Sequence, residues 1–149
     1  MSKHVRTDIR NALVVRLTGL HTTGVNVFAT RSYPLGDSKL PCLMVMLNDE
    51  VQIEEGATRN PIIQRTVELQ IRCVTKESAG LDEKLDDMIA EVEEAMQGAG
   101  LLGGLVDVIS TPRYIRVGVD DSLEKPVGIA DVNYEVRYST IAGSPGVTV

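Results

Sequence analysis

The segment from Ile62 to Val74 alternates apolar and polar residues, and this pattern restricts the possible folds more than any other feature of the chain. Alternation with a period of two predicts a strand with one face on a core and the other in water or on a polar partner. Antiparallel sheets carry such strands far more often than parallel sheets do. Apart from Arg65, the predicted core face is apolar and comprises Ile63, Val67, Leu69, Ile71 and Cys73.

Two segments predict amphipathic helices, residues 4–19 and 79–97. In each segment the apolar residues recur mostly at intervals of three and four, which places them on one stripe of a helix. Ser78 is the expected N-cap of the second helix, and Gly19 and Gly98 are the expected helix ends. The stripes comprise Val5, Ile9, Ala12, Leu13, Leu17 and Leu20, and then Leu81, Leu85, Met88, Ile89, Val92, Ala95 and Met96.

Further strands are predicted over residues 25–30, 41–47, 105–119 (with a bend at Thr111–Pro112) and 128–140. Long polar connections are expected over residues 48–61 and 120–128. The order α-β-β-β-α-β-β predicts an α+β fold, a mostly antiparallel β-sheet with two amphipathic helices packed on one face. We expect a single domain over residues 1–141 and a flexible C-terminal tail over residues 142–149.

Composition excludes several classes of protein. Hydrophobic residues make up 43% and charged residues 24% of the 149 residues, as in ordinary globular chains. No apolar run approaches the roughly 20 residues that span a bilayer, and the N-terminal segment lacks the apolar stretch of a signal peptide. A net charge of −6 and only 3% aromatic residues make nucleic acid a poor primary ligand. Cys42 and Cys73 have no CxxC partner and are expected to be reduced core residues.

No motif indicates a catalytic, cofactor or metal site. Residues 98–103 match the pattern GxGxxG, but a predicted helix precedes them and a strand follows, which is the reverse of a dinucleotide site. We therefore expect a helix stop and a turn there. His4 and His21 lack the spacing of metal ligands. The acidic face of the second helix is either a solvated surface or a functional acidic one. These residues predict a protein that is not an enzyme.

Several apolar residues lie outside the predicted core. Val14 and Val15 fall off the stripe of the first helix, and others lie in predicted loops: Leu35, Val51, Ile53, Leu123 and Val127. Such residues either fold back onto their own core or become ordered against a partner. Self-association is the commonest use of such a surface. Arg59, the only basic residue in an acidic stretch, is a candidate partner for a carboxylate of a neighbouring subunit. The candidate contacts with a subunit or tube are therefore Val14, Val15, Val51, Ile53, Arg59 and Leu123.

The chain as a whole resembles the tail terminator (tail completion) proteins of long-tailed bacteriophages, including the small minor tail protein of lambda-like phages. The resemblance starts with the N-terminal helix TDIRNALVVRL and the strand LPCLMVML after a proline-containing loop. It continues with the alternating strand QRTVELQIRCVT, which runs directly into the acidic helix GLDEKLDDMIAEVEEAM. It ends with the strands TPRYIRVGV and IADVNYEVRYST.

This resemblance implies a subunit without catalytic residues that forms a hexameric ring on the growing end of the tail tube. The ring would stop tube polymerisation and present the surface to which the filled head attaches, through a head–tail connector or neck protein. DNA would pass through the lumen without specific binding, and an acidic subunit suits this passage because a negative lumen repels the phosphate backbone. The resemblance places the protein in the tail of the virion, assembled in the host cytoplasm and without a membrane partner.

Three other functions fit the residues. Another phage neck or tail-tube morphogenesis protein could share this order of elements, and a tube protein would polymerise indefinitely instead of closing a ring. A small metal-dependent enzyme could use loop carboxylates such as Asp120 and Asp121, and stabilisation by a metal would indicate it. A generic binding module would bind a partner in solution without forming rings.

Overall fold

The computed structural model describes residues 3–31, 39–56, 60–120 and 126–149. The strands within these residues are β1 (Val27–Phe28), β2 (Cys42–Glu55), β3 (Ile62–Lys76), β4 (Val108–Ile109), β5 (Tyr114–Asp120), β6 (Val127–Ile141) and β7 (Ser144–Thr148). They form one sheet in the order β1-β2-β3-β6-β4, and β5 and β7 also pair with β6. Of these strand pairs, only β1 with β2 is parallel.

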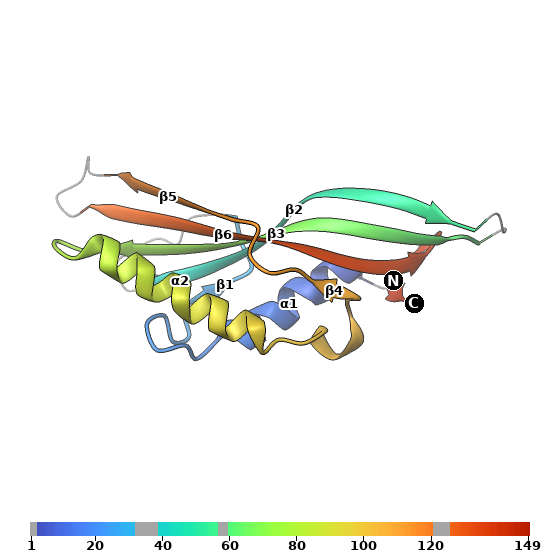
Figure 1. Cartoon of the computed structure of the whole chain (residues 1–149). Coiled ribbons are helices and arrows are strands. Elements are labelled where there is room, and N and C mark those ends of the chain that lie inside the picture. The colour runs from blue at the N-terminus through green and yellow to red at the C-terminus, as the bar shows by residue number, and fades with distance from the viewer. Residues whose placement is uncertain (1–2, 32–38, 57–59, 121–125) are drawn as a thin grey trace.

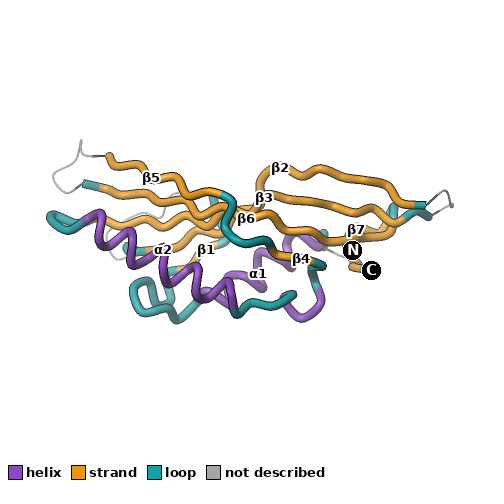
Figure 2. The backbone as a smooth tube through the Cα atoms, viewed as in Figure 1, coloured by secondary structure: helices purple, strands orange, loops and turns teal. Residues whose placement is uncertain are grey.

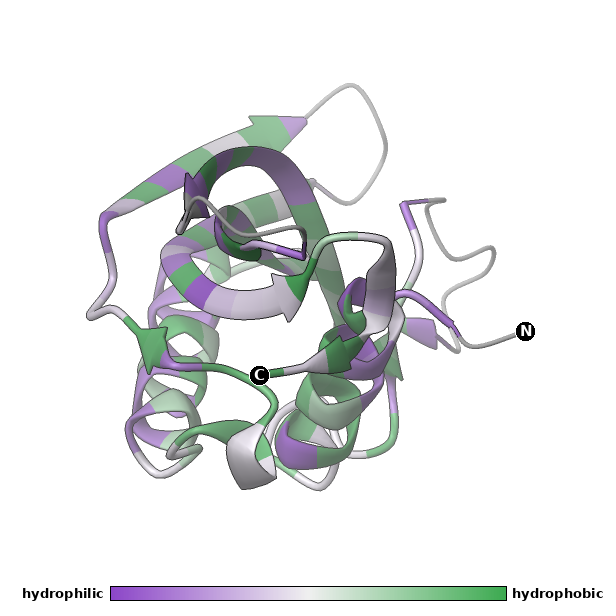
Figure 3. Cartoon of the chain, turned by 90° about the vertical axis from the view of Figure 1, so that its right-hand side faces the viewer, coloured by the Kyte–Doolittle hydropathy of each residue, from purple (hydrophilic) through white to green (hydrophobic). Residues whose placement is uncertain are grey.

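Both helices, α1 (Val5–Leu17) and α2 (Leu81–Gln97), lie on one face of the sheet (Figures 1 and 2). Figure 3 shows the two helices below the strands when the molecule is viewed from one end. The predicted α+β class and the order of helices and strands are confirmed. Within the described residues, neither helix is long and apolar enough to cross a bilayer.

Helix α1 begins after His4, whose Nδ1 accepts a hydrogen bond from the backbone N–H of Arg6 at 3.1 Å. This cap satisfies one of the N–H groups that the first turn of a helix leaves unpaired. Burial, followed by the positive charge of Arg65, lowers the pKa of His4, which favours the neutral ring that can accept this bond. The buried residues of the helix, at intervals of four, confirm the predicted stripe: Val5, Ile9, Leu13 and Leu17.

Helix α2 begins after Gly80, which has a φ of +70° and makes no side-chain cap. The predicted N-cap at Ser78 is therefore wrong, because the chain turns through the left-handed conformation at Gly80 and enters the helix only after it. The acidic residues Asp82 and Glu83 lie in the first turn, where the positive end of the helix dipole favours them.

The C-terminal half of α2 is tied to α1 and to the turn that follows α1. Arg16 of α1 donates from Nε to the carbonyl oxygen of Ala95 at 2.9 Å, at the end where helix carbonyls lack partners. Glu91 accepts hydrogen bonds from the backbone N–H and the hydroxyl of Thr22, with the N–H bond at 2.8 Å. Gly98 is the C-cap, so the GxGxxG segment begins as the predicted helix stop.

Strand β2 differs most from the sequence prediction. It was expected to end near Leu47 and to be followed by a polar connection, but it continues to Glu55 and pairs with β3 along this length. The register shifts between Leu47 and Glu50, which marks a β-bulge. Before the bulge the odd-numbered residues of β2 face the helices, and after it the even-numbered residues do. Val51 and Ile53 therefore face away from the helices. The prediction of a loop was wrong because the alternation of these two residues with polar ones is the pattern of a strand.

The other predicted strands are confirmed with shifted bounds. The segment 105–119 is interrupted near the predicted bend at Thr111–Pro112 and gives the separate strands β4 and β5. Within the segment 142–149, which was predicted as a tail, Ser144–Thr148 form β7 and pair with the end of β6. Gly143, with a φ of +82°, permits the reversal between the two strands, and their backbone pairing stabilises a segment whose composition is typical of a loop.

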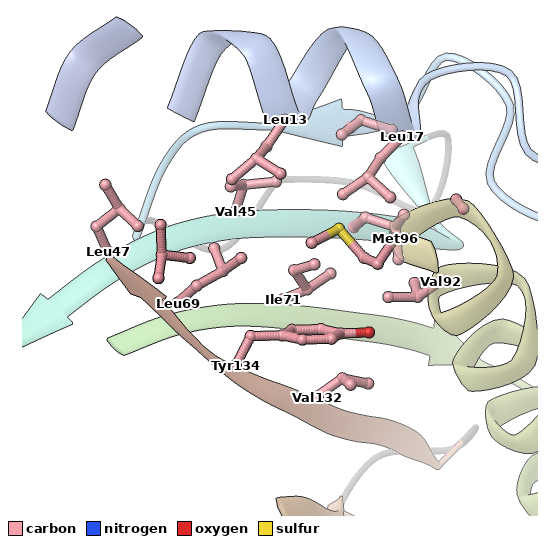
Figure 4. Close-up of a cluster of buried hydrophobic side chains, with 14 of the residues drawn as sticks. Leu13, Leu17, Val45, Leu47, Leu69, Ile71, Val92, Met96, Val132 and Tyr134 are labelled. Atoms are coloured by element: carbon pink, nitrogen blue, oxygen red, sulfur yellow. The ribbon is translucent and has the colours of Figure 1, made fainter. Parts of the chain in front are cut away.

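The core lies between the helices and the sheet, and Figure 4 shows part of it. The labelled side chains come from both helices and from β2, β3 and β6: Leu13, Leu17, Val45, Leu47, Leu69, Ile71, Val92, Met96, Val132 and Tyr134. Cys73 belongs to this core, whereas Cys42 belongs to a smaller apolar cluster on the other face. Both thiols are buried and free, as predicted, and burial raises their pKa values to about 12 and about 11.

Candidate assembly surfaces

Beyond the helices, the sheet continues as a distal arm, which we define as residues 50–55, 62–66 and 137–141 (Figure 1). Apolar side chains lie exposed on the face of the arm that points away from the helices. Val51 is 68% exposed and Ile53 57% exposed, and Ile62 and Ile141 lie exposed as a cross-strand pair on the same face. We call these four residues the arm patch. Such a group of neighbouring aliphatic side chains in water indicates a contact surface.

The opposite face of the arm carries an ion-pair network centred on Glu50. Oε2 of Glu50 accepts from Nη1 of Arg65 at 3.0 Å. Oε1 accepts from Nη1 of Arg6 at 3.2 Å and from the hydroxyl of Tyr138 at 2.5 Å. Arg6 also donates to the carbonyl oxygen of Leu47 at 3.0 Å. The network therefore ties the first turn of α1 to the bulge at which the arm begins.

The groups of this network keep their protonation states near neutral pH and do not exchange protons. The side chains of Glu50 and Arg65 are each 9% exposed. Burial opposes ionisation of Glu50, but hydrogen bonds from Tyr138, Gln52, Arg65 and Arg6 outweigh it and hold its pKa below the ordinary value. Burial and the bond to Glu50 raise the pKa of Tyr138. At neutral pH the carboxylate accepts and the hydroxyl donates, so the network is a structural anchor.

Strand β5 is an exposed edge of the sheet at the end opposite to the arm. It pairs with residues 127–133 of β6, whereas the arm contains residues 137–141 of that strand. The register places Ile115, Val117 and Val119 on the helix side, yet they are 44–52% exposed, because α2 does not cover them. We call these three residues the edge row. On the other face, the guanidinium of Arg116 lies 5.6 Å from the ring centre of Tyr114.

A shallow hollow of about 380 Å³ on the open face of the sheet lies between these two regions, and its lining includes Val51 and Tyr114. The hydroxyl of Tyr114 donates to Glu68 at 3.0 Å, and this bond raises the pKa of the phenol. Among the residues that the structure describes, no three His, Cys, Asp or Glu side chains gather closely enough to hold a metal ion.

The structure separates the predicted contact residues. Val51 and Ile53 lie together in the arm patch. Val15 is 76% exposed on α1, nine residues and hence about 13 Å along the helix from Arg6, while Val14 is half-buried and packs against the core. Arg59 and Leu123 lie outside the described residues.

Sequence reasoning missed the edge row and the partner of Arg65. The edge row shows in the sequence only as apolar residues at alternate positions of the predicted strand 105–119, which does not tell an exposed row from a core face. The pairing of Arg65 with Glu50 had no local signal, because Glu50 was assigned to a loop. Only the long β2–β3 pairing brings the two residues together.

The fold and these surfaces define a class of protein: a small α+β subunit whose distinctive exposed groups are apolar side chains on regular strands, as in components of assemblies. The match to known families is specific. Residues 4–138 match the phage minor tail protein U family, so the chain belongs to that family and is a structural protein of a phage tail.

Comparison with solved structures finds a similar chain in the virion of a native gene transfer agent particle. The two chains are 15% identical, the alignment covers 92% of each, and the TM-score is 0.36. No curated protein matches the sequence.

Proposed function

We propose that this protein is a tail terminator subunit. It forms a closed ring, a hexamer, on the end of the tail tube and stops tube polymerisation. The ring then provides the surface to which the head attaches. The subunit is not an enzyme in this proposal, and it assembles in the host cytoplasm before it becomes part of the virion tail.

The observation that carries the proposal is the position of the exposed apolar residues in a member of a tail protein family. The arm patch and the edge row lie on ordered strands at the two ends of one sheet. A monomer leaves both surfaces in water, whereas each subunit of a ring has two neighbours and buries two different surfaces. The composition also supports the proposal, because a net charge of −6 per subunit suits a lumen through which DNA slides without binding.

The proposed partners are other copies of this chain, the tail tube protein and a head–tail connector or neck protein. Val15 on α1 lies on the body of the subunit, separate from the arm patch, and is a proposed contact with a subunit or the tube. Arg59 and Leu123 remain proposed contacts with a subunit or the tube.

The test is the mass of the purified protein by light scattering over a concentration series, with electron microscopy of any large species. We expect a closed species of about 97 kDa, the mass of six copies of 16.2 kDa, either for the protein alone or after addition of tail tubes. Tubes that carry a ring should stop growing at that end when more tube protein is added.

Two results would contradict this proposal. Open filaments of the protein alone would indicate a tube protein. A monomer at every concentration that is also not recruited to tube ends would indicate another neck component or a binding module, and stabilisation by a divalent metal in that case would favour the enzyme.

A further inference from the structure

The sheet has two unpaired edges, and they lie at opposite ends of the molecule. On one side, β1 pairs only with Leu43 and Met44 of β2, and no described strand pairs with the outer edge of β2 beyond them. On the other side, β6 is the only described strand that pairs with β5. An unpaired edge presents a row of backbone donors and acceptors to any strand that approaches, so both edges are open to pairing.

Among the described residues, neither edge is covered by another element. Soluble proteins protect an edge strand with charged side chains, above all lysine, or with proline, a bulge or a covering element. Residues 114–120 of β5 contain no Lys and no Pro, and all seven are exposed. The three residues of the edge row are β-branched, which favours the extended conformation that pairing requires. The bulge in β2 lies before the arm and leaves residues 50–55 as a regular strand.

The two edges differ in charge. Residues 49–54 of β2 include Asp49, Glu50 and Glu54 and no Lys or Arg, and Asp49 and Glu54 are exposed. Residues 113–120 include Arg113, Arg116 and Asp120, all exposed, and so carry a net charge of +1. Two copies of the acidic β2 edge would repel each other, whereas this edge and the arginines of the β5 edge would attract.

We propose that β5 of one copy pairs with the outer edge of β2 in the distal arm of the next copy. Within one chain, β2 is antiparallel to β3, β3 to β6 and β6 to β5, so β5 runs antiparallel to β2. Two copies with the same face of the sheet on the same side, shifted along the strands because β5 lies at the end opposite to the arm, therefore bring these edges together as an antiparallel pair. Tyr114 and Arg116 then lie on the same face as Val51 and Ile53. The aromatic ring and the guanidinium would then extend the arm patch and cover part of it.

This contact joins two different edges, so each copy of a pair keeps one free edge, β2 in one copy and β5 in the other, to which a further copy can bind. Head-to-tail contacts of this type close into a ring when the rotation between neighbours permits it. The inference rests on the proposed function and specifies the contact between subunits within the proposed ring.

The test is a charge swap across the contact. Arg116→Glu and Asp49→Arg each place like charges on the same open face of the paired edges, and we expect each variant to need at least tenfold more protein to reach the same assembled fraction, alone or on tail tubes. An equimolar mixture of the two variants should assemble like the wild-type protein, because alternating copies restore opposite charges at every contact. Glu94→Arg, an exposed charge reversal near the end of α2 beside α1, is the matched control and should assemble normally.

The outcomes separate this contact from the proposed function. If the wild-type protein forms rings but both variants assemble like the control, the contact lies elsewhere and only the inference fails. If each variant is defective and the mixture is no better, the two edges do not meet and the inference fails again. If the wild-type protein assembles neither alone nor on tubes, both proposals fail. Melting temperatures near the wild-type value in all variants would show that the substitutions left the fold intact.

Discussion

The body and the distal arm belong to the same sheet but are stabilised in different ways. In the body, two helices cover one face, and side chains such as Leu13, Leu69 and Val132 are fully buried between the layers. In the arm, the strands extend beyond the helices, one face is exposed, and the other holds the network around Glu50. Apolar burial stabilises the body, whereas backbone pairing and a few charges stabilise the arm. Regions with fewer buried contacts open at lower free energy, so the arm is the part of the sheet that a partner can stabilise most.

The largest difference between the regions should appear when a large apolar side chain is truncated in each. Leu13→Ala removes a fully buried side chain from the body and should lower the free energy of unfolding by about 3 kcal/mol. Ile53→Ala in the arm patch removes an exposed side chain and should lower it by less than about 0.5 kcal/mol. Urea unfolding followed by circular dichroism measures both. Equal losses would mean that the arm patch is buried in the isolated chain.

The second prediction concerns the network that joins the arm to the body. Arg65→Met leaves the carboxylate of Glu50 without the more buried of its two arginine partners and should lower the free energy of unfolding by about 2 to 3 kcal/mol. The double variant Glu50→Gln with Arg65→Met should lose less than the sum of the two single losses, because the uncompensated charge is also removed.

A matched surface pair provides the control for this network. Nε of Arg113 lies 3.7 Å from Oε2 of Glu135, and the two side chains are 55% and 43% exposed. Arg113→Met should therefore cost less than about 0.5 kcal/mol. If Arg65→Met costs no more than this control, the network does not anchor the arm.

The contrast between the two regions also explains which parts of the fold could be predicted. The body follows local patterns: the helix stripes and the alternation in Ile62–Val74 indicate both the elements and the faces that they bury. The arm depends on a pairing between strands that only the tertiary fold establishes. Once Glu50 was read as part of a polar loop, the charge of Arg65 on an apolar face had no explanation. The edge row could not be distinguished from a core strand, because a sequence pattern shows which residues are apolar and not whether a helix covers them.

The third prediction tests how closely α2 packs on the body. A Cβ atom at Gly128 would lie 2.8 Å from Cδ1 of Leu85 and 2.9 Å from Cδ1 of Leu81, so Gly128→Ala must shift these two side chains at the start of α2. We expect a loss of about 1 to 2 kcal/mol in the free energy of unfolding. Gly118→Ala on β5 is the control, because its Cβ would meet no atom within 4 Å. It should leave stability unchanged or slightly raise it. A neutral Gly128→Ala would mean that α2 packs more loosely than the structure indicates.

The smallest expected effect on stability comes from protonation of the Glu50 carboxylate at low pH. Because its pKa is lower in the folded protein than in the unfolded chain, the carboxylate stabilises the fold above the unfolded pKa of about 4.5, and this contribution is lost as the pH falls through the folded pKa. Glu50→Gln should therefore reduce the decline in stability that the wild-type protein shows below pH 4.5. Glu54→Gln, which changes an exposed carboxyl of the same strand, should leave that decline unchanged. Urea unfolding at a series of pH values measures the difference, and parallel curves for the wild-type protein and Glu50→Gln would show that the network does not hold the Glu50 carboxylate in its ionised form.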